Sequence, residues 1–166
     1  MKKYYAKIGQ KSEHITKFFT LDRLQKVDWV EFPGFMGTLV MPEIMSKEPF
    51  CAAVEDKWPG SVGIIMRLDP HVAYLWHRDV DRSFTINMLL HDNSHSHTVF
   101  GQRRTEFNSD IHELKYDLGH FYIFNTQEEH EVYNFDEYRY LFTMKVPTDE
   151  DYSSVVEWAG ENGWLF

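Results

Sequence analysis

Three residues of this chain have the types and the spacing of an iron-binding set. His77 and Asp79 are separated by a single residue, and His130 opens a strand-like run much later in the chain. Two imidazoles and one carboxylate can hold non-haem Fe(II) on one side and leave its other coordination positions open. Arg139 lies on the apolar segment that follows, where its planar guanidinium suits a cosubstrate that carries a carboxylate. This combination predicts an oxygenase.

The elements around these residues also favour a shared metal ion. His77 and Asp79 precede a predicted strand, and alternate residues of an extended segment point the same way. Distant strands of an antiparallel barrel can meet across its interior, which allows His130 to join the pair. The chain has nine histidines, so the alternative is a surface ion pair between His77 and Asp79 and a core or loop role for His130.

Composition indicates one globular domain over residues 1–166, rich in aromatic side chains (16%). The net charge of -9 argues against a nucleic-acid partner. The single cysteine, Cys51, excludes an internal disulfide, fits a reducing compartment and is predicted to be buried. The sequence shows no apolar run of membrane-spanning length and no secretory signal, so we expect a soluble cytoplasmic protein. Its oligomeric state stays open.

Residues from Ser61 onward have the texture of short strands between turns. Strands are predicted over 61–68, 83–90, 97–102, 111–116, 120–125, 131–135 and 138–146. Helices are predicted after Thr20, over 43–58, and from a capping box at Thr148 through Glu157. Pro33-Gly34 predicts a turn. The pattern is typical of a mainly β protein, a barrel or sandwich of about eight strands with helices at both ends.

Several motifs carry a resemblance to a known family. His77-Arg78-Asp79 is followed by the glycine-led run Gly119–Asn125, then by His130-Glu131-Val132-Tyr133-Asn134, then by Arg139 at the start of an apolar strand. This order resembles the 2-oxoglutarate/Fe(II)-dependent oxygenase superfamily, and most closely its aspartyl/asparaginyl β-hydroxylase branch. The resemblance covers about residues 60–146 and implies a double-stranded β-helix, the jelly roll that cupins share.

The resemblance also implies roles for these residues. His77, Asp79 and His130 would bind Fe(II), and Arg139 would pair with the distal carboxylate of 2-oxoglutarate. The iron would keep a position for O2, and the reaction would convert 2-oxoglutarate to succinate and CO2. The implied function is hydroxylation of a small molecule or of a protein side chain, so the expected partner is a small-molecule or peptide substrate.

One part of the cosubstrate site departs from that branch. The branch usually has an R-x-H on the strand after the first metal motif, and this chain has Thr85-Ile86-Asn87 there. Asn87 is a candidate hydrogen-bond partner of the cosubstrate, and Arg82 is a candidate source of the missing charge.

Two other functions stay open. A cupin-like module could bind a metal or ligand without turnover, although it would not need a buried arginine facing the metal. Hydroxylation of prolyl residues is disfavoured, since many such family members have lysine at the cosubstrate position.

Other candidate residues have simpler interpretations. The His91–His97 loop contains three histidines and is interpreted as a solvated hairpin loop. The alternatives are a substrate-facing lip and a second metal site. Tyr74 and Trp76 flank the first motif and are expected to be core residues, with a pocket contact as the alternative. His71 is expected to lie in a loop, and Asn134 to position His130.

Overall fold

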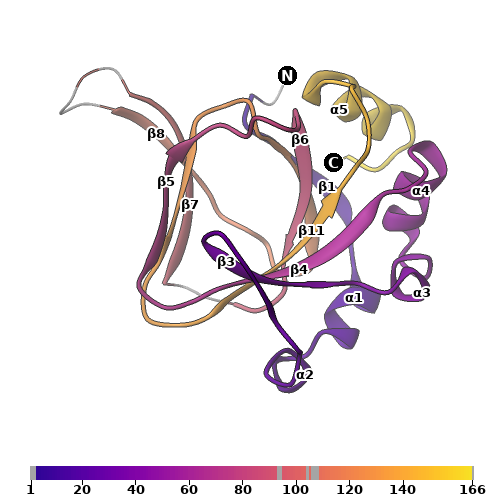
Figure 1. The fold of residues 1–166 in the computed structure, drawn as a ribbon. Helices are drawn as coiled ribbons and strands as arrows, with labels where there is room; N and C mark the ends of the chain where they lie inside the picture. Colours follow the sequence, from indigo (N-terminus) through magenta and orange to yellow (C-terminus); the bar gives the residue numbers. More distant parts are fainter. Residues whose placement is uncertain (1–2, 93–94, 104, 106–108, 166) are drawn as a thin grey trace.

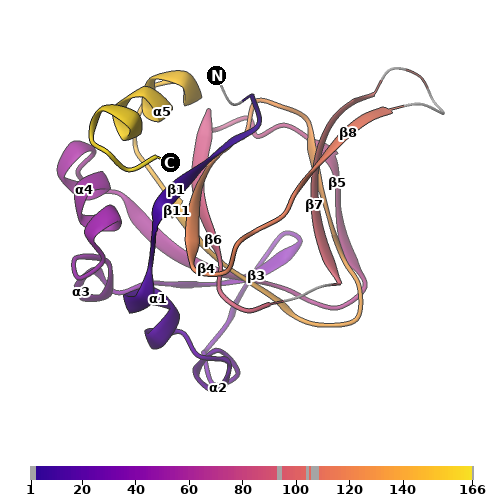
Figure 2. The ribbon, with the colours of Figure 1, turned by 180° about the vertical axis from the view of Figure 1, so that it is seen from behind.

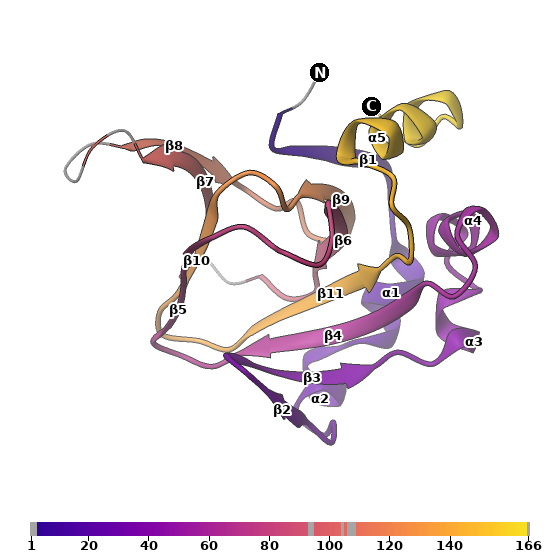
Figure 3. The same cartoon turned by 45° about the horizontal axis from the view of Figure 1, so that its top comes forward.

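The computed structural model describes residues 3–92, 95–103, 105 and 109–165. Two antiparallel β-sheets face each other across a barrel-like interior, as Figure 1 and Figure 3 show. The larger sheet has the order β1-β9-β6-β11-β4-β3-β2, and the smaller has the order β5-β10-β7-β8. The strands are β1 Tyr5–Lys11, β2 Val30–Phe32, β3 Phe35–Leu39, β4 Val62–Leu68, β5 Val72–His77, β6 Phe84–Leu89, β7 Ser96–Arg103, β8 Ser109–Leu114, β9 His120–Asn125, β10 His130–Asn134 and β11 Arg139–Lys145.

The helices gather on the outer face of the larger sheet (Figures 1 and 2). They are α1 Glu13–Phe18, α2 Leu21–Leu24, α3 Pro42–Met45, α4 Pro49–Lys57 and α5 Tyr152–Glu161. Their apolar side chains, among them Ile15, Phe50 and Val155, form one buried cluster with the outward-facing residues of the sheet. No helix in the described part of the chain is long and apolar enough to cross a membrane.

Alternation along the central strands separates this core from the barrel interior. All six residues of β6 are buried. Ile86 and Met88 join the helix-facing cluster, whereas Thr85 and Asn87 line the interior. In β11 Phe142 likewise packs under the helices, while alternate residues face inward. These strands therefore carry apolar residues towards the helices and several polar ones, Thr85, Asn87 and Thr143, towards the interior, which equips it for a polar ligand.

The mainly β prediction is confirmed, and each predicted strand is present with small shifts at its ends. Four strands were not predicted. β1 pairs with β9 at one edge of the larger sheet, β2 and β3 extend the other edge, and β5 pairs with β10 in the smaller sheet. The predicted turn joins β2 to β3, and Gly34 there has φ +89, which glycine adopts readily. Cys51 is buried, as predicted.

Two helix predictions were wrong in detail. The single helix over 43–58 is in fact α3 and α4, because Pro49 cannot continue a helix and instead occupies the first turn of α4. The last helix is capped by Asp151, whose Oδ1 accepts the amide of Ser154 at 2.8 Å, and not by Thr148. It consequently has no acid in its first turn, and it continues to Glu161.

Candidate metal centre

A β-bulge in β5 turns His77 towards the barrel interior. Leu75 and Trp76 together stand opposite the single residue Glu131 of β10. The extra residue reverses the alternation of the strand, so Leu75 and Trp76 both lie on the outer face. Tyr74 and His77, on either side of them, both face the interior. Without the bulge, His77 would point to the opposite side of the sheet from Tyr74.

The structure brings His77, Asp79 and His130 together at one end of the interior. The Nε2 atom of His77 lies 3.6 Å from Asp79 Oδ1, and Nε2 of His130 lies 3.9 Å from the same oxygen. The two imidazole centroids are 4.2 Å apart. Within the described residues this is the one group in which three metal-ligating side chains place their ligand atoms within 4.8 Å of one another.

Backbone carbonyls set the tautomer of both histidines. Nδ1 of His77 lies 2.7 Å from the carbonyl oxygen of Leu75, and Nδ1 of His130 lies 2.9 Å from that of Glu128. A carbonyl oxygen only accepts, so each Nδ1 carries the proton and each Nε2 offers a lone pair to the shared point. Burial lowers the pKa of His130, which keeps this imidazole neutral and available to a metal.

Asp79 is held by Arg82 and by the turn between β9 and β10. Arg82 Nε donates to Asp79 Oδ2 at 2.6 Å, which leaves Oδ1 to face the histidines. The amide of Asp79 donates to the carbonyl of Thr126 at 3.1 Å, and the Gln127 side chain donates to the carbonyl of Asp79 at 3.0 Å. Arg82 therefore positions the carboxylate, and a contact between Arg82 and the cosubstrate stays a prediction.

The donor set fits a divalent transition metal. Two neutral imidazoles and a carboxylate are ligands that suit Fe(II), and all three come from one side. Adjacent ligands of an ion with bonds of 2.0–2.3 Å lie about 3 Å apart, so the three ligand atoms must draw closer together to bind it.

The cavity beside this set has a volume of about 140 Å³, and we call it the barrel cavity. Arg139, the first residue of β11, lines it and is only 3% exposed. Its Nη2 donates to Thr98 Oγ1 at 2.8 Å, whereas its Nη1 is buried without a partner. No carboxylate of the described residues forms an ion pair with it, and burial lowers its pKa. A buried guanidinium in this state calls for an anion.

Further polar groups surround the guanidinium. The ring of Tyr116 lies 5.6 Å from Arg139 Cζ, and its hydroxyl interacts with Asn87, Thr98 and Arg139. Burial raises the pKa of Tyr116, so its hydroxyl stays protonated and can donate. Asn87 is 6% exposed and lines the same cavity. Sequence reasoning missed Thr98 and Tyr116, because nothing in two strand-like segments marks which alternate residue faces a ligand.

Asn134 fixes the chain just before Arg139. Its side-chain amide donates to the carbonyl of Asp69 at 2.8 Å and to that of Glu137 at 2.7 Å. These bonds tie the end of β10 to the turn that leads into β11. Asn134 thus positions Arg139 more directly than it positions His130, the role that the sequence suggested.

The remaining candidates lie away from the metal set. His97 is on β7, where its Nδ1 is 2.6 Å from Glu113 Oε1, and His95 Nδ1 is 3.4 Å from Asp136. The middle of the predicted loop, residues 93–94, lies outside the described residues. His71 lies in a turn with φ 60.

The comparisons with known proteins bear on the fold. Neither a family model nor a curated protein sequence matches this chain. Several solved structures, however, match it in fold. A Pseudomonas putida prolyl-4-hydroxylase has a TM-score of 0.64 at 10% identity, over 86% of this chain and 91% of that one. The non-haem α-ketoglutarate-dependent epimerase SnoN from nogalamycin biosynthesis has a TM-score of 0.60 at 13% identity (87% and 78%). HygX from Streptomyces hygroscopicus, solved with nickel, 2-oxoglutarate and hygromycin B, has a TM-score of 0.57 at 14% identity (89% and 83%).

This chain has the fold of 2-oxoglutarate/Fe(II) oxygenases. The similarity confirms the predicted jelly roll with its flanking helices. At 10–14% identity it concerns the fold alone. The aspartyl/asparaginyl β-hydroxylase branch and the roles of single residues stay predictions that the chemistry of the site must support.

Proposed function

We propose that this protein is an Fe(II)- and 2-oxoglutarate-dependent dioxygenase. The overall reaction would be 2-oxoglutarate + O2 + R–H → succinate + CO2 + R–OH, with R–H a carbon centre of a small molecule or of a protein side chain. The metal and the cosubstrate would supply the activation of O2.

The observation that carries the proposal is the unpaired end of Arg139. A cupin-like module that only binds a metal gains nothing from a buried guanidinium that lacks an acidic partner. An oxo acid with a second carboxylate explains why the barrel cavity holds both a candidate metal set and a buried arginine, because its far carboxylate would pair with Arg139 Nη1. The near end would then lie towards His77 and His130, which line the same cavity.

The residues that line the barrel cavity then each have a physical role. His77, Asp79 and His130 would hold the metal, and Arg82 keeps the Asp79 carboxylate turned towards it. The Tyr116 hydroxyl, which interacts with Arg139, would donate to the cosubstrate. Apolar side chains, Phe124, Val132 and Leu141 among them, line the rest and limit the access of water.

The size of the cavity bears on where the substrate binds. Pockets for drug-sized ligands have volumes of roughly 300–1,000 Å³, and the barrel cavity has about 140 Å³. A small dicarboxylic acid would occupy it almost completely. We therefore expect the substrate to approach past Phe35 and Tyr74, which line the cavity and are partly exposed. The Tyr74 hydroxyl donates to the carbonyl of Pro33 at 2.7 Å.

The test does not require the substrate. Protein purified without oxygen is given Fe(II), ascorbate and 2-oxoglutarate and is then exposed to air, and succinate is measured over time. Such oxygenases release succinate slowly without their substrate, so we expect a slow release that Asp79→Ala strongly reduces. Wild-type protein that binds Fe(II) and 2-oxoglutarate but releases no succinate would favour the binding module instead. A screen of amino acids, peptides and lipids for a gain of one oxygen atom would then identify the substrate.

A further inference from the structure

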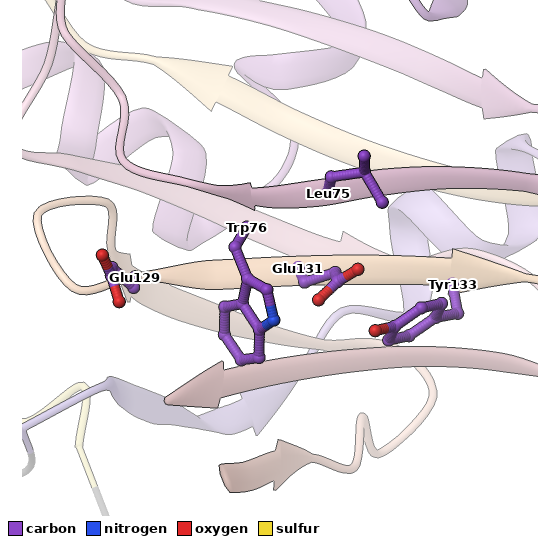
Figure 4. Close-up of a pocket in the computed structure, with 5 residues that line it drawn as sticks. All are labelled: Leu75, Trp76, Glu129, Glu131 and Tyr133. Atoms are coloured by element: carbon purple, nitrogen blue, oxygen red, sulfur yellow. The ribbon is translucent and has the colours of Figure 1, made fainter. Parts of the chain in front are cut away.

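A second pocket lies on the outer face of the smaller sheet, behind the metal centre. Its volume is about 530 Å³, and it is lined by Leu75 and Trp76 of β5, Glu129, and Glu131 and Tyr133 of β10 (Figure 4). Residues 129, 131 and 133 alternate with the inward-facing His130 and Val132, so their side chains share the outer face. We call this the outer pocket.

Glu131 is buried in this pocket without a full set of partners. It is 2% exposed, and its Oε2 has no hydrogen-bond partner in the described structure. No described cationic side chain pairs with it or with Glu129. A carboxylate removed from water costs free energy unless a cation or a donor compensates it.

Aromatic rings form two walls of the pocket, one on each side of Glu131. The Trp76 indole extends from β5 across β10, on one side of Glu131, while Tyr133 lies on the other (Figure 4). The indole reaches Gly101 of β7, where an added Cβ would lie 2.9 Å from the Trp76 ring. Because Gly101 has no side chain, the Trp76 ring can extend over β7.

A pocket with a carboxylate on each side of the Trp76 indole is suited to an organic cation (Figure 4). A positive charge is attracted to the faces of Trp and Tyr rings, and N–H donors on the same group pair with carboxylate oxygens. A metal ion is a poor alternative, since the pocket does not assemble three metal-ligating side chains in the described structure. We propose that the outer pocket binds an alkylammonium or guanidinium group, carried by a free amine or by a lysine or arginine side chain. This site is separate from the proposed oxygenase centre.

The indole N–H signal of Trp76 reports on this site directly. Full-length protein with Zn²⁺ in place of iron is titrated with n-butylammonium or methylguanidinium, and ¹H–¹⁵N spectra are recorded. The chain has five tryptophans, so Trp76→Phe identifies the signal. We expect a saturable shift with a Kd of roughly 10–100 mM, as a single cation–π contact and an open ion pair would give. Tetramethylammonium, which lacks N–H donors, should bind at least threefold more weakly, and 1-butanol should not bind.

Variants separate the site from a general salt effect. Glu131→Gln keeps the shape of the side chain, and its loss of charge should weaken butylammonium binding roughly tenfold. Glu129→Gln should weaken it severalfold and serves where Glu131→Gln does not fold. Glu128→Gln is the matched control, because Glu128 pairs with Lys3 at 3.2 Å and does not line the pocket.

One further titration, with a lysine-containing peptide, identifies the source of the cation. Acetyl-Gly-Lys-Gly-amide that binds at least tenfold more tightly than butylammonium indicates a protein segment, and equal or weaker binding indicates a free amine. The proposal is overturned if butanol shifts the Trp76 signal as butylammonium does, or if no saturable shift occurs. It is also overturned if the glutamine variants that fold bind as Glu128→Gln does. None of these outcomes depends on succinate release, so the proposed oxygenase activity stands or falls separately.

Discussion

Replacing Arg139 with methionine tests the cosubstrate site through stability as well as binding. In the free protein Arg139 is 3% exposed, makes one hydrogen bond to Thr98 and leaves Nη1 unpaired. Methionine fills a similar volume without a buried charge, so we expect the variant to be as stable as the wild type, or more so, when no 2-oxoglutarate is present. The variant should, however, lose most of its response to that ligand.

The size of the effect follows from ligand linkage. With Zn²⁺ bound to prevent turnover, 2-oxoglutarate at 100 times its Kd stabilises the wild type by about 2.7 kcal/mol. For a chain of this length each kcal/mol corresponds to about 2–4 °C, which gives a Tm increase of roughly 5–11 °C. Loss of a charge-assisted pair worth about 1.5–3 kcal/mol raises Kd at least tenfold. At the same ligand concentration the variant then gains about 1.4 kcal/mol or less, so its Tm increase is halved or smaller.

The assay is a thermal melt with and without 2-oxoglutarate, supported by calorimetric titration. Arg67→Met is the matched control, because Arg67 lies on β4 of the same sheet but pairs with Asp69 at 3.0 Å and does not line the barrel cavity. It should keep the full increase in Tm. An Arg139→Met protein with the wild-type response would refute the assignment of Arg139 to the cosubstrate.

Three further substitutions test other parts of the molecule. Arg82→Gln releases one oxygen of Asp79, so Zn²⁺ affinity should fall roughly tenfold or more while the Kd for 2-oxoglutarate at saturating metal changes little; the reverse pattern would make Arg82 a cosubstrate ligand. His130→Ala should reduce succinate release and metal affinity more than Asp79→Ala, since only His77 and Asp79 on one short segment remain as ligands. If His130→Ala is as active as the wild type, the assignment of this metal centre is wrong. Glu48 is 3% exposed, and burial raises its pKa. The folded protein therefore loses stability as pH rises from the ordinary glutamate range through that raised pKa, and below the ordinary range this loss is absent. Glu48→Gln should therefore raise Tm at pH 7 and lose this advantage near pH 4, whereas the exposed Glu43→Gln should show no such pH dependence.

The convergence of His77, Asp79 and His130 was predictable because their residue types and spacing suit a shared ion. Two histidines and an aspartate have few alternative uses at positions that strands can bring together, and the arginine at the start of the last strand narrows the chemistry further. The chain of short apolar segments likewise predicted most of the strands, since alternation reads directly as a half-buried sheet.

The parts that were missed depend on packing between distant segments. β1 is a strand because β9 offers it an edge, and Tyr5 pairs with Phe124 across more than a hundred residues. Tyr116 reaches the barrel cavity only because β8 leads into it from the far side of the smaller sheet. Neither residue carries a local signal of its contact. Pro49 did carry a signal for the break between α3 and α4, and helix propensity on both sides outweighed it in the prediction.

The β5 bulge links the two sites of the smaller sheet. By placing one extra residue opposite Glu131, it turns His77 inward and leaves Trp76 outward. In a regular strand with Tyr74 facing inward, Trp76 would face inward and His77 outward, so neither orientation would be satisfied. The bulge is therefore a single local feature that places the candidate ligand His77 in the barrel cavity and gives the outer pocket one of its aromatic walls. A change that removed it would disturb both sites at once, whereas Arg139→Met acts on the barrel cavity and Glu129→Gln on the outer pocket alone.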